Sequence, residues 1–173
     1  MLLLLFALPF LGSLGAAFLP TRSRNAAAAL AGTVTLAGLA ILIAYYPGLA
    51  DGHSSVRLVI PWLSSLGLDL TVRLAGFTWL FSMLILGIGA LVVLYARYYM
   101  SSKDPVPRFF AFLLAFMGSM LGMVLSGNLV QIAFFWELTS LFSFLLIGYW
   151  HHNQSARDGA RMALIVTAFG GVC

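Results

Sequence analysis

One acidic residue in the middle of an apolar segment is the strongest candidate for chemistry in this sequence. Among the five acidic residues of the chain, Glu137 is the one inside an apolar run, which extends from Ile132 to Ile147. At a helical rise of 1.5 Å per residue, Glu137 lies about 20 Å from His151 and His152, close to mid-membrane. A charge at that depth costs at least about 3 kcal/mol, so we interpret Glu137 as functional, with the proton-relay role usual for intramembrane acids.

The residues near Glu137 cannot neutralise a carboxylate. Ser140 lies three positions further on, and Ser143 continues the same helical face, so both hydroxyl groups can hydrogen-bond a carboxyl group. Arg161 is the nearest cationic candidate, but helix geometry leaves an axial gap of about 12 Å. Three states of Glu137 remain open: a protonated carboxyl group, an ion pair with a base from beyond Cys173 or another chain, and a hydrated pathway. A structural alternative is a neutral glutamic acid that joins two helices by hydrogen bonds.

A histidine pair follows at the end of the same segment. Histidine titrates near neutral pH, so His152, with His151, could load protons at the membrane surface. The simpler interpretation is that both are interfacial loop residues. Nothing in the sequence supplies the other ligands of a metal site, and a single cysteine, Cys173, excludes an internal disulfide and a cysteine-based metal site. We expect no metal and no cofactor.

The composition indicates what kind of element positions these residues. Of the 173 residues, 62% are hydrophobic and 8% are charged, and the mean hydropathy is +1.03. Soluble domains are about one quarter charged, so these values exclude a soluble globular protein, a disordered tail and a nucleic-acid-binding protein. The net charge of +4 then reports orientation in a membrane. We predict an integral membrane protein.

Apolar runs separated by short polar breaks predict an all-α, polytopic helical bundle. A spanning helix needs about 20 residues, so the chain has room for five spans and part of a sixth, in one transmembrane domain over residues 1–173. Small residues at four-residue spacing, within residues 12–16 and 118–122, predict close helix packing. The predicted spans cover residues 2–19, 26–46, 77–99, 109–125 and 129–150, and the sixth begins near residue 156 and is cut off at Cys173.

The one long connection, residues 48–75, predicts a small β-hairpin outside the membrane. Apolar and polar residues alternate over residues 68–74, which is typical of a strand with one exposed face. Residues 56–60 can pair with this strand across a turn at residues 64–67. We interpret Arg57, Asp69 and Arg73 as solvated charges at the edge of this hairpin.

Positive charge is distributed unevenly among the connections. The second connection balances two arginines with two aspartates, and the fourth has no charge. Positive residues concentrate in cytoplasmic loops. We therefore predict that the chain lies in a bacterial inner membrane, with the first, third and fifth connections on the cytoplasmic side. The amino terminus and the hairpin then face outward. The residues behind this prediction are Arg22 and Arg24, Lys103 and Arg108, and Arg157 and Arg161.

The fifth predicted span carries a specific motif. Its sequence, Phe135-Trp-Glu-Leu-Thr-Ser-Leu-Phe-Ser-Phe-Leu-Leu-Ile-Gly-Tyr-Trp-His-His152, resembles the large A-type subunit of Mrp-type multisubunit sodium/proton antiporters. The related antiporter-like subunits of respiratory complex I share Trp-Glu and Leu-Leu-Ile-Gly, but Glu-Leu-Thr-Ser and Trp-His-His fit the Mrp branch better. Supporting matches lie at residues 87–100 and 166–171. The chain departs from the family pattern at Ala75, where an acid usually precedes glycine, and at Ala168, which is often glycine.

The resemblance implies that the chain is the amino-terminal part of an antiporter-like subunit. Glu137 matches the family's essential glutamate, and the resemblance implies a partner lysine and a broken helix in the remainder of the subunit. The resemblance implies a subunit of a transporter, not of an enzyme, and a complex that exchanges Na⁺ for H⁺. The implied partners are the other antiporter subunits of a hetero-oligomer and the surrounding membrane lipid. Two alternatives are a proton-pumping membrane subunit of an NADH:quinone oxidoreductase and a non-transporting assembly scaffold.

Overall fold

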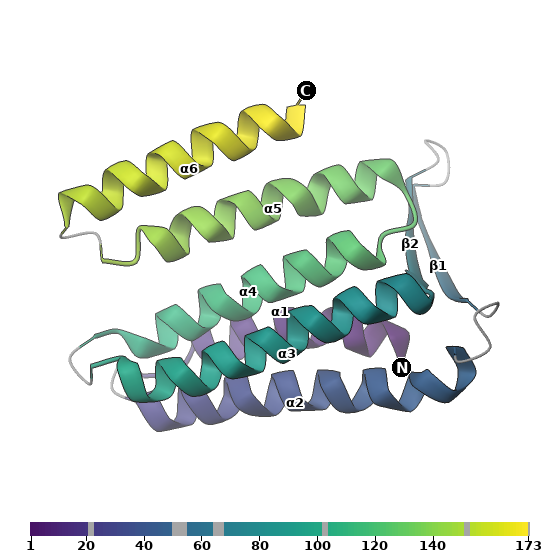
Figure 1. Ribbon diagram of the computed structural model, residues 1–173, viewed down its shortest axis with the longest axis horizontal. Coiled ribbons are helices and arrows are strands. Elements are labelled where there is room, and N and C mark those ends of the chain that lie inside the picture. The colour runs from purple at the N-terminus through teal and green to yellow at the C-terminus, as the bar shows by residue number, and fades with distance from the viewer. Residues whose placement is uncertain (21–22, 50–54, 64–67, 102–103, 151–152, 173) are drawn as a thin grey trace.

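The computed structural model describes the chain except for residues 21–22, 50–54, 64–67, 102–103, 151–152 and 173. Successive helices run in opposite directions, and a two-stranded hairpin lies between the second and the third helix (Figure 1). The described elements are α1 (Leu2–Ala17), α2 (Arg24–Leu49), β1 (Val56–Leu63), β2 (Leu68–Leu74), α3 (Gly76–Tyr99), α4 (Val106–Leu125), α5 (Leu129–Ile147) and α6 (Gln154–Val172).

The connections gather at the two ends of the bundle. The amino terminus, the hairpin and the α4–α5 turn share one end, and the α1–α2, α3–α4 and α5–α6 connections share the other (Figure 1). Arg24 ties two connections at this second end, because its guanidinium donates a hydrogen bond of 3.3 Å to the carbonyl oxygen of Met100. Arg97 lies in the last turn of α3, and Arg108 and Arg157 lie in the first turns of α4 and α6. We refer to this end, with Arg24, Arg97, Arg108 and Arg157, as the arginine-rich end.

The predicted multi-pass helical bundle is confirmed. Within the described residues, α2, α3, α4 and α5 are long and apolar enough to cross a membrane, whereas α1 is apolar but has 16 residues. α1 ends before the predicted residue 19 because Pro20 disfavours helical geometry in Leu19, the residue that precedes it. α4 begins earlier than predicted because Pro107 lies in its first turn, where a missing N–H removes no helical hydrogen bond. α5 ends at Ile147 rather than at residue 150, followed by Gly148 at its cap.

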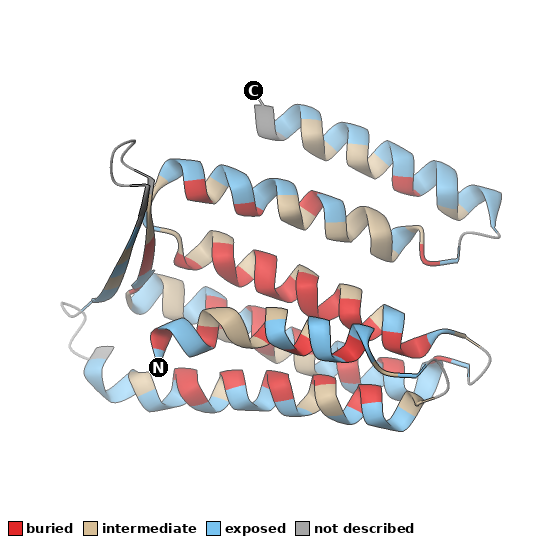
Figure 2. Ribbon diagram, turned by 180° about the vertical axis from the view of Figure 1, so that it is seen from behind, coloured by how far each residue is buried: buried red, intermediate tan, exposed pale blue. Residues whose placement is uncertain are grey.

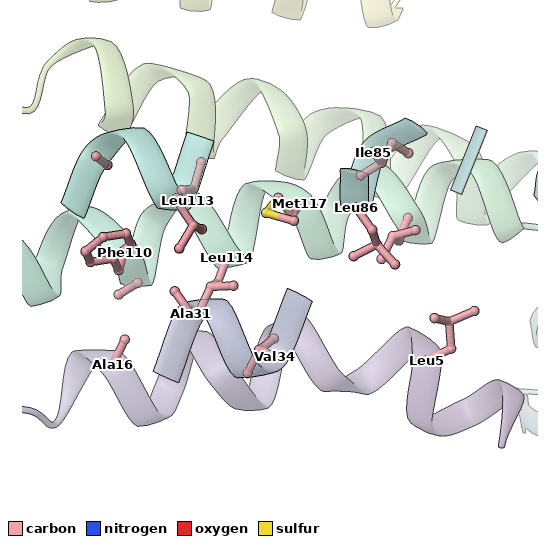
Figure 3. Packing of buried hydrophobic residues seen from close by; sticks show 14 of the residues in the cluster. Leu5, Ala16, Ala31, Val34, Ile85, Leu86, Phe110, Leu113, Leu114 and Met117 are labelled. Atoms are coloured by element: carbon pink, nitrogen blue, oxygen red, sulfur yellow. The ribbon is translucent and has the colours of Figure 1, made fainter. Parts of the chain in front are cut away.

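α4 is the central helix and is buried along most of its length (Figure 2). Its fully buried Phe110 and Leu114 point toward the small residues of α1 and α2 (Figure 3). A Cβ atom added to Gly118 would lie 3.1 Å from the Phe10 ring of α1. The close packing predicted from small residues is therefore present, since glycine lets the neighbouring side chain approach the α4 backbone.

The hairpin has the predicted antiparallel pairing, with β1 longer than expected at its carboxyl end. Arg57 lies opposite Arg73, and both are exposed, which agrees with their interpretation as solvated edge charges. Val72 is fully buried and bridges to Ser126 in the α4–α5 turn. The hairpin thus packs against the turn that leads into α5, while the predicted turn at residues 64–67 lies outside the described residues.

Candidate functional site

Glu137 lies near the middle of α5. It is the ninth of the 19 residues of this helix, so the helical rise places it about 12 Å from Leu129 and about 15 Å from Ile147. Both ends of α5 lie at the ends of the bundle (Figure 1). The structure therefore places this residue at the mid-height of a helix long enough to span a membrane.

The Glu137 side chain is on an exposed face of α5. Val130, Ala133, Phe134 and Leu141 are exposed on the same face, at helical spacing before and after it. Glu137 makes no hydrogen bond and no ion pair with any residue in the described ranges, including Arg161. Within the described part of the chain, this face, which we call the Glu137 face, is apolar except for the carboxyl group.

Ser140 faces a different part of the structure. Its side chain is buried, and its hydroxyl donates a hydrogen bond of 3.2 Å to the Trp136 carbonyl oxygen. It lines a cavity of about 280 Å³ formed by α4, α5 and α6, together with Thr139, Ser143 and Thr167. Glu137 is not among the lining residues of this cavity. The structure therefore shows no contact of the Ser140 hydroxyl with the Glu137 carboxyl group, and a supporting role for Ser140 stays a prediction.

Three polar contacts that were not predicted from the sequence hold the amino-terminal end of α5. The Asn128 side chain caps the helix by accepting a hydrogen bond of 3.0 Å from the Val130 N–H. The Gln131 Oε1 atom accepts a hydrogen bond of 3.0 Å from the Thr71 N–H of β2, and the Thr71 carbonyl accepts one of 2.9 Å from the Gly127 N–H. The first of these has a sequence signal, because asparagine before an apolar run is a typical helix start.

An aromatic contact, two residues before Glu137, holds α5 against α1 and α4. The Phe135 ring is 5% exposed and meets the Phe6 ring edge-on, with ring centres 5.5 Å apart. A Cβ atom on Gly122 of α4 would lie 2.5 Å from the same ring. Because Phe135 is enclosed between α1 and α4, the Glu137 side chain, two residues later, points away from both helices.

The histidine pair at the end of the fifth predicted span, His151 and His152, lies outside the described residues. The proton-loading role of His152 therefore stays a prediction. In the ranges that the structure describes, no group of three or more histidine, cysteine, aspartate or glutamate side chains could hold a metal ion.

Two family profiles match the chain. Residues 60–110 match the family described as "NADH-Ubiquinone oxidoreductase (complex I), chain 5 N-terminus", and residues 126–173 match "NADH:quinone oxidoreductase/Mrp antiporter, TM". Over these residues, the chain is therefore similar to antiporter-like membrane subunits. The second match contains all of α5 and thus Glu137.

Relatives of this chain carry antiporter names. It is 58% identical, over 95% of its length, to a probable K(+)/H(+) antiporter subunit of the A/B type from Rhizobium meliloti. It is 46% identical, over 77% of its length, to the A-type subunit of a Na(+)/H(+) antiporter from Alkalihalophilus pseudofirmus. The chain spans 16% and 17% of these two proteins. The relatives are transporter subunits rather than enzymes.

Solved structures with a similar fold include two respiratory or antiporter complexes. A chain of the Mrp complex from Dietzia sp. DQ12-45-1b matches with a TM-score of 0.78 and 27% identity, over 99% of this chain and 18% of the other. A chain of an archaeal membrane-bound sulfane sulfur reductase matches with a TM-score of 0.76 and 21% identity, over 98% of this chain and 25% of the other, which shows a shared fold.

Proposed function

We propose that this chain is part of a multisubunit cation/proton antiporter in which Glu137 binds and releases the transported proton. The observation that carries the proposal is the Glu137 face: one carboxyl group at mid-height of a spanning helix, exposed on an otherwise apolar face. Sequence similarity supports an antiporter role, because the relatives named above are antiporter subunits.

The cost of the charge indicates that protein covers the Glu137 face in the assembled antiporter. A carboxylate left in hydrocarbon costs at least about 3 kcal/mol, whereas a basic partner or water beside it lowers that cost. α4 and α6 occupy other sides of α5 (Figure 1), and the described residues place no cation on the carboxyl group. We infer that the basic partner comes from protein outside these 173 residues, either the remainder of the subunit or another subunit of the complex.

In the proposed mechanism, Glu137 alternates between two environments. When the basic group approaches, the carboxylate form is stabilised and the proton leaves; when the base turns away, the apolar surroundings favour the protonated form. The exchanged cation in this proposal is Na⁺, although one relative is named for K⁺. We also propose that the arginine-rich end faces the cytoplasm, because positive residues concentrate on that side.

The test is a substitution that removes the proton site and keeps its shape. Glu137→Gln, in the complete antiporter, should reduce Na⁺-driven proton movement in everted vesicles to the background of vesicles without the antiporter, because an amide cannot carry the proton. Glu137→Asp keeps the acid and should retain part of the exchange. Both variants are measured with Na⁺ and with K⁺, by a fluorescent pH indicator, after the amount of assembled complex has been equalised.

The control changes an acid outside the Glu137 face. Asp158 is exposed on α6 near the arginine-rich end, and Asp158→Asn makes the same chemical change with no expected loss of exchange. Normal exchange in Glu137→Gln would contradict the proton role and favour the scaffold alternative. NADH oxidation that copurifies with the chain would favour the oxidoreductase alternative, which the complex I profile match keeps open.

A further inference from the structure

A second feature lies between α2 and α3, on the opposite side of the bundle from α5 (Figure 1). A groove of about 450 Å³ runs between these helices, within the range of about 300–1,000 Å³ typical of small-molecule sites. Small residues form much of its α2 wall, and larger aliphatic residues form its α3 wall. The residues that define its floor, its rim and its charged end include Ala28, Gly32, Thr33, Thr35, Val93 and Arg97.

The groove opens on the outer surface of the bundle, between exposed residues of α2 and α3. Its floor is buried, at Ala28, Thr35 and Val93, whereas Thr33 and Leu94 on its rims are exposed. Both threonine hydroxyls donate hydrogen bonds to carbonyl oxygens of their own helix, at 2.9 Å for Thr33 and 3.0 Å for Thr35. Because these hydroxyl protons are occupied, the groove offers an apolar surface to whatever fills it.

The length of the groove corresponds to one leaflet. It extends along α2 from Ala28 to Leu36, and eight residue steps at 1.5 Å give about 12 Å. Half of a bilayer's hydrocarbon core is about 15 Å. A helix from another subunit would run past this length, whereas an acyl chain of a single leaflet matches it.

A cation lies at one end of the groove, at membrane-surface level. Arg97 is exposed in the last turn of α3, and its guanidinium carbon lies 5.9 Å from the centre of the Tyr98 ring. Tyr95 and Tyr99, at the same end of α3, stack on each other with ring centres 5.2 Å apart, and both are exposed. Exposed tyrosines at a helix end are typical of the membrane–water interface. In the described ranges, Arg97 forms no ion pair, so its charge is available to an anionic group.

We propose that this groove binds one anionic phospholipid of the leaflet at the arginine-rich end. An acyl chain lies along Gly32 between α2 and α3, and the headgroup phosphate lies at the guanidinium of Arg97. Charge complementarity selects an anionic lipid, since juxtamembrane arginines attract anionic headgroups, and the apolar, leaflet-long groove selects an acyl chain. This inference does not depend on the role of Glu137.

Two substitutions separate the headgroup contact from the acyl-chain contact. Arg97→Gln removes the charge and should reduce occupancy by anionic lipid about fivefold, the factor that corresponds to about 1 kcal/mol per arginine near a membrane surface. Gly32→Leu places an aliphatic side chain in the groove, where a Cβ atom on Gly32 meets no other atom within 4 Å. It should reduce occupancy by anionic and zwitterionic lipids alike.

Each variant has a matched control on the same bundle. Gly87 on α3 also has open space around an added Cβ and is not among the groove residues, so Gly87→Leu should leave lipid occupancy unchanged. Arg157 lies at the same end of the bundle as Arg97 but away from the groove, so Arg157→Gln controls for loss of one positive charge.

The measurement uses the full chain in nanodiscs that contain equal amounts of phosphatidylglycerol and phosphatidylcholine. After transfer to a delipidating detergent, native mass spectrometry gives the fraction of protein that retains one lipid. We expect phosphatidylglycerol to be retained preferentially by the wild-type chain and both controls. Retention of phosphatidylglycerol in Arg97→Gln or Gly32→Leu at the wild-type level would overturn the proposal. Ala29 also lines the groove. A photo-crosslinker at this position that captures polypeptide instead of lipid, in membranes with the complete antiporter, would also overturn the proposal.

Discussion

Close packing between α4 and α5 makes Gly122→Ala an informative perturbation. The added Cβ atom would lie 2.5 to 2.7 Å from three atoms of the Phe135 ring, whereas carbon atoms in contact are about 3.5–4.0 Å apart. The ring or its helix must therefore move by about 1 Å. Phe135 is 5% exposed and packs edge-on against Phe6, so the ring has little free space. Overpacking of this kind costs about 1–3 kcal/mol.

A second glycine isolates the packing contribution. Alanine is favoured over glycine inside a helix by about 0.5–1 kcal/mol, and this gain is expected in both Gly122→Ala and Gly87→Ala. An added Cβ on Gly87 meets no other atom within 4 Å, so Gly87→Ala receives the gain without the packing cost. The free energy of unfolding of Gly122→Ala should thus lie about 2 kcal/mol below that of Gly87→Ala.

Thermal unfolding of the full chain in detergent, followed by tryptophan fluorescence, measures this difference. About 2 kcal/mol corresponds to a Tm difference of about 4–8 °C for a chain of this size. Adding Phe135→Leu to Gly122→Ala should recover part of the loss, because the smaller side chain leaves room for the new methyl group, and such coupling is expected for residues in contact. Equal Tm values for the two glycine variants would refute the inferred contact between α4 and Phe135.

Two further predictions concern the ends of α5. Burial, with a smaller contribution from Asp104, raises the pKa of Tyr149 from 10.0 to about 12; since the folded state holds this proton more tightly than the unfolded state, stability should fall as pH rises from 10 to 12. Tyr149→Phe should remove that decline in Tm without lowering Tm at pH 7, because the buried hydroxyl has no hydrogen-bond partner within the described residues. Asn128→Ala should lower the free energy of unfolding by about 0.5–2 kcal/mol, measured in the same way, because the Val130 N–H loses its capping acceptor.

The helices and the hairpin follow from patterns that short windows of sequence contain. Apolar runs of membrane length between polar breaks predict α2 to α5, and alternation over residues 68–74 predicts β2. The errors lie at helix ends, where local chemistry decides. Pro107 is tolerated inside the first turn of α4, and Gly148 ends α5 before the apolar run itself is finished.

The contacts that position α5 could not be predicted from the sequence in the same way. Gln131 and Thr71 are 60 residues apart, and their hydrogen bond depends on how the hairpin packs over the α4–α5 turn. Likewise, the edge-on contact of Phe135 with Phe6 joins the fifth helix to the first. Helical periodicity does not reveal this pairing, because α5 is apolar on nearly all sides and no single stripe marks its buried face.

This uniform apolarity explains why Glu137 could be identified and its surroundings could not. A single acid in a spanning helix is conspicuous by its cost, whichever way it points. Its direction is determined by Phe135, which two residues earlier is enclosed between α1 and α4 and so turns the carboxyl group outward. With Phe135 enclosed in this way, the buried Ser140 side chain lines the cavity formed by α4, α5 and α6. α5 therefore contributes the Ser140 hydroxyl to this cavity and leaves the Glu137 carboxyl group outside its lining, so the proposed proton role of Glu137 does not rest on the cavity.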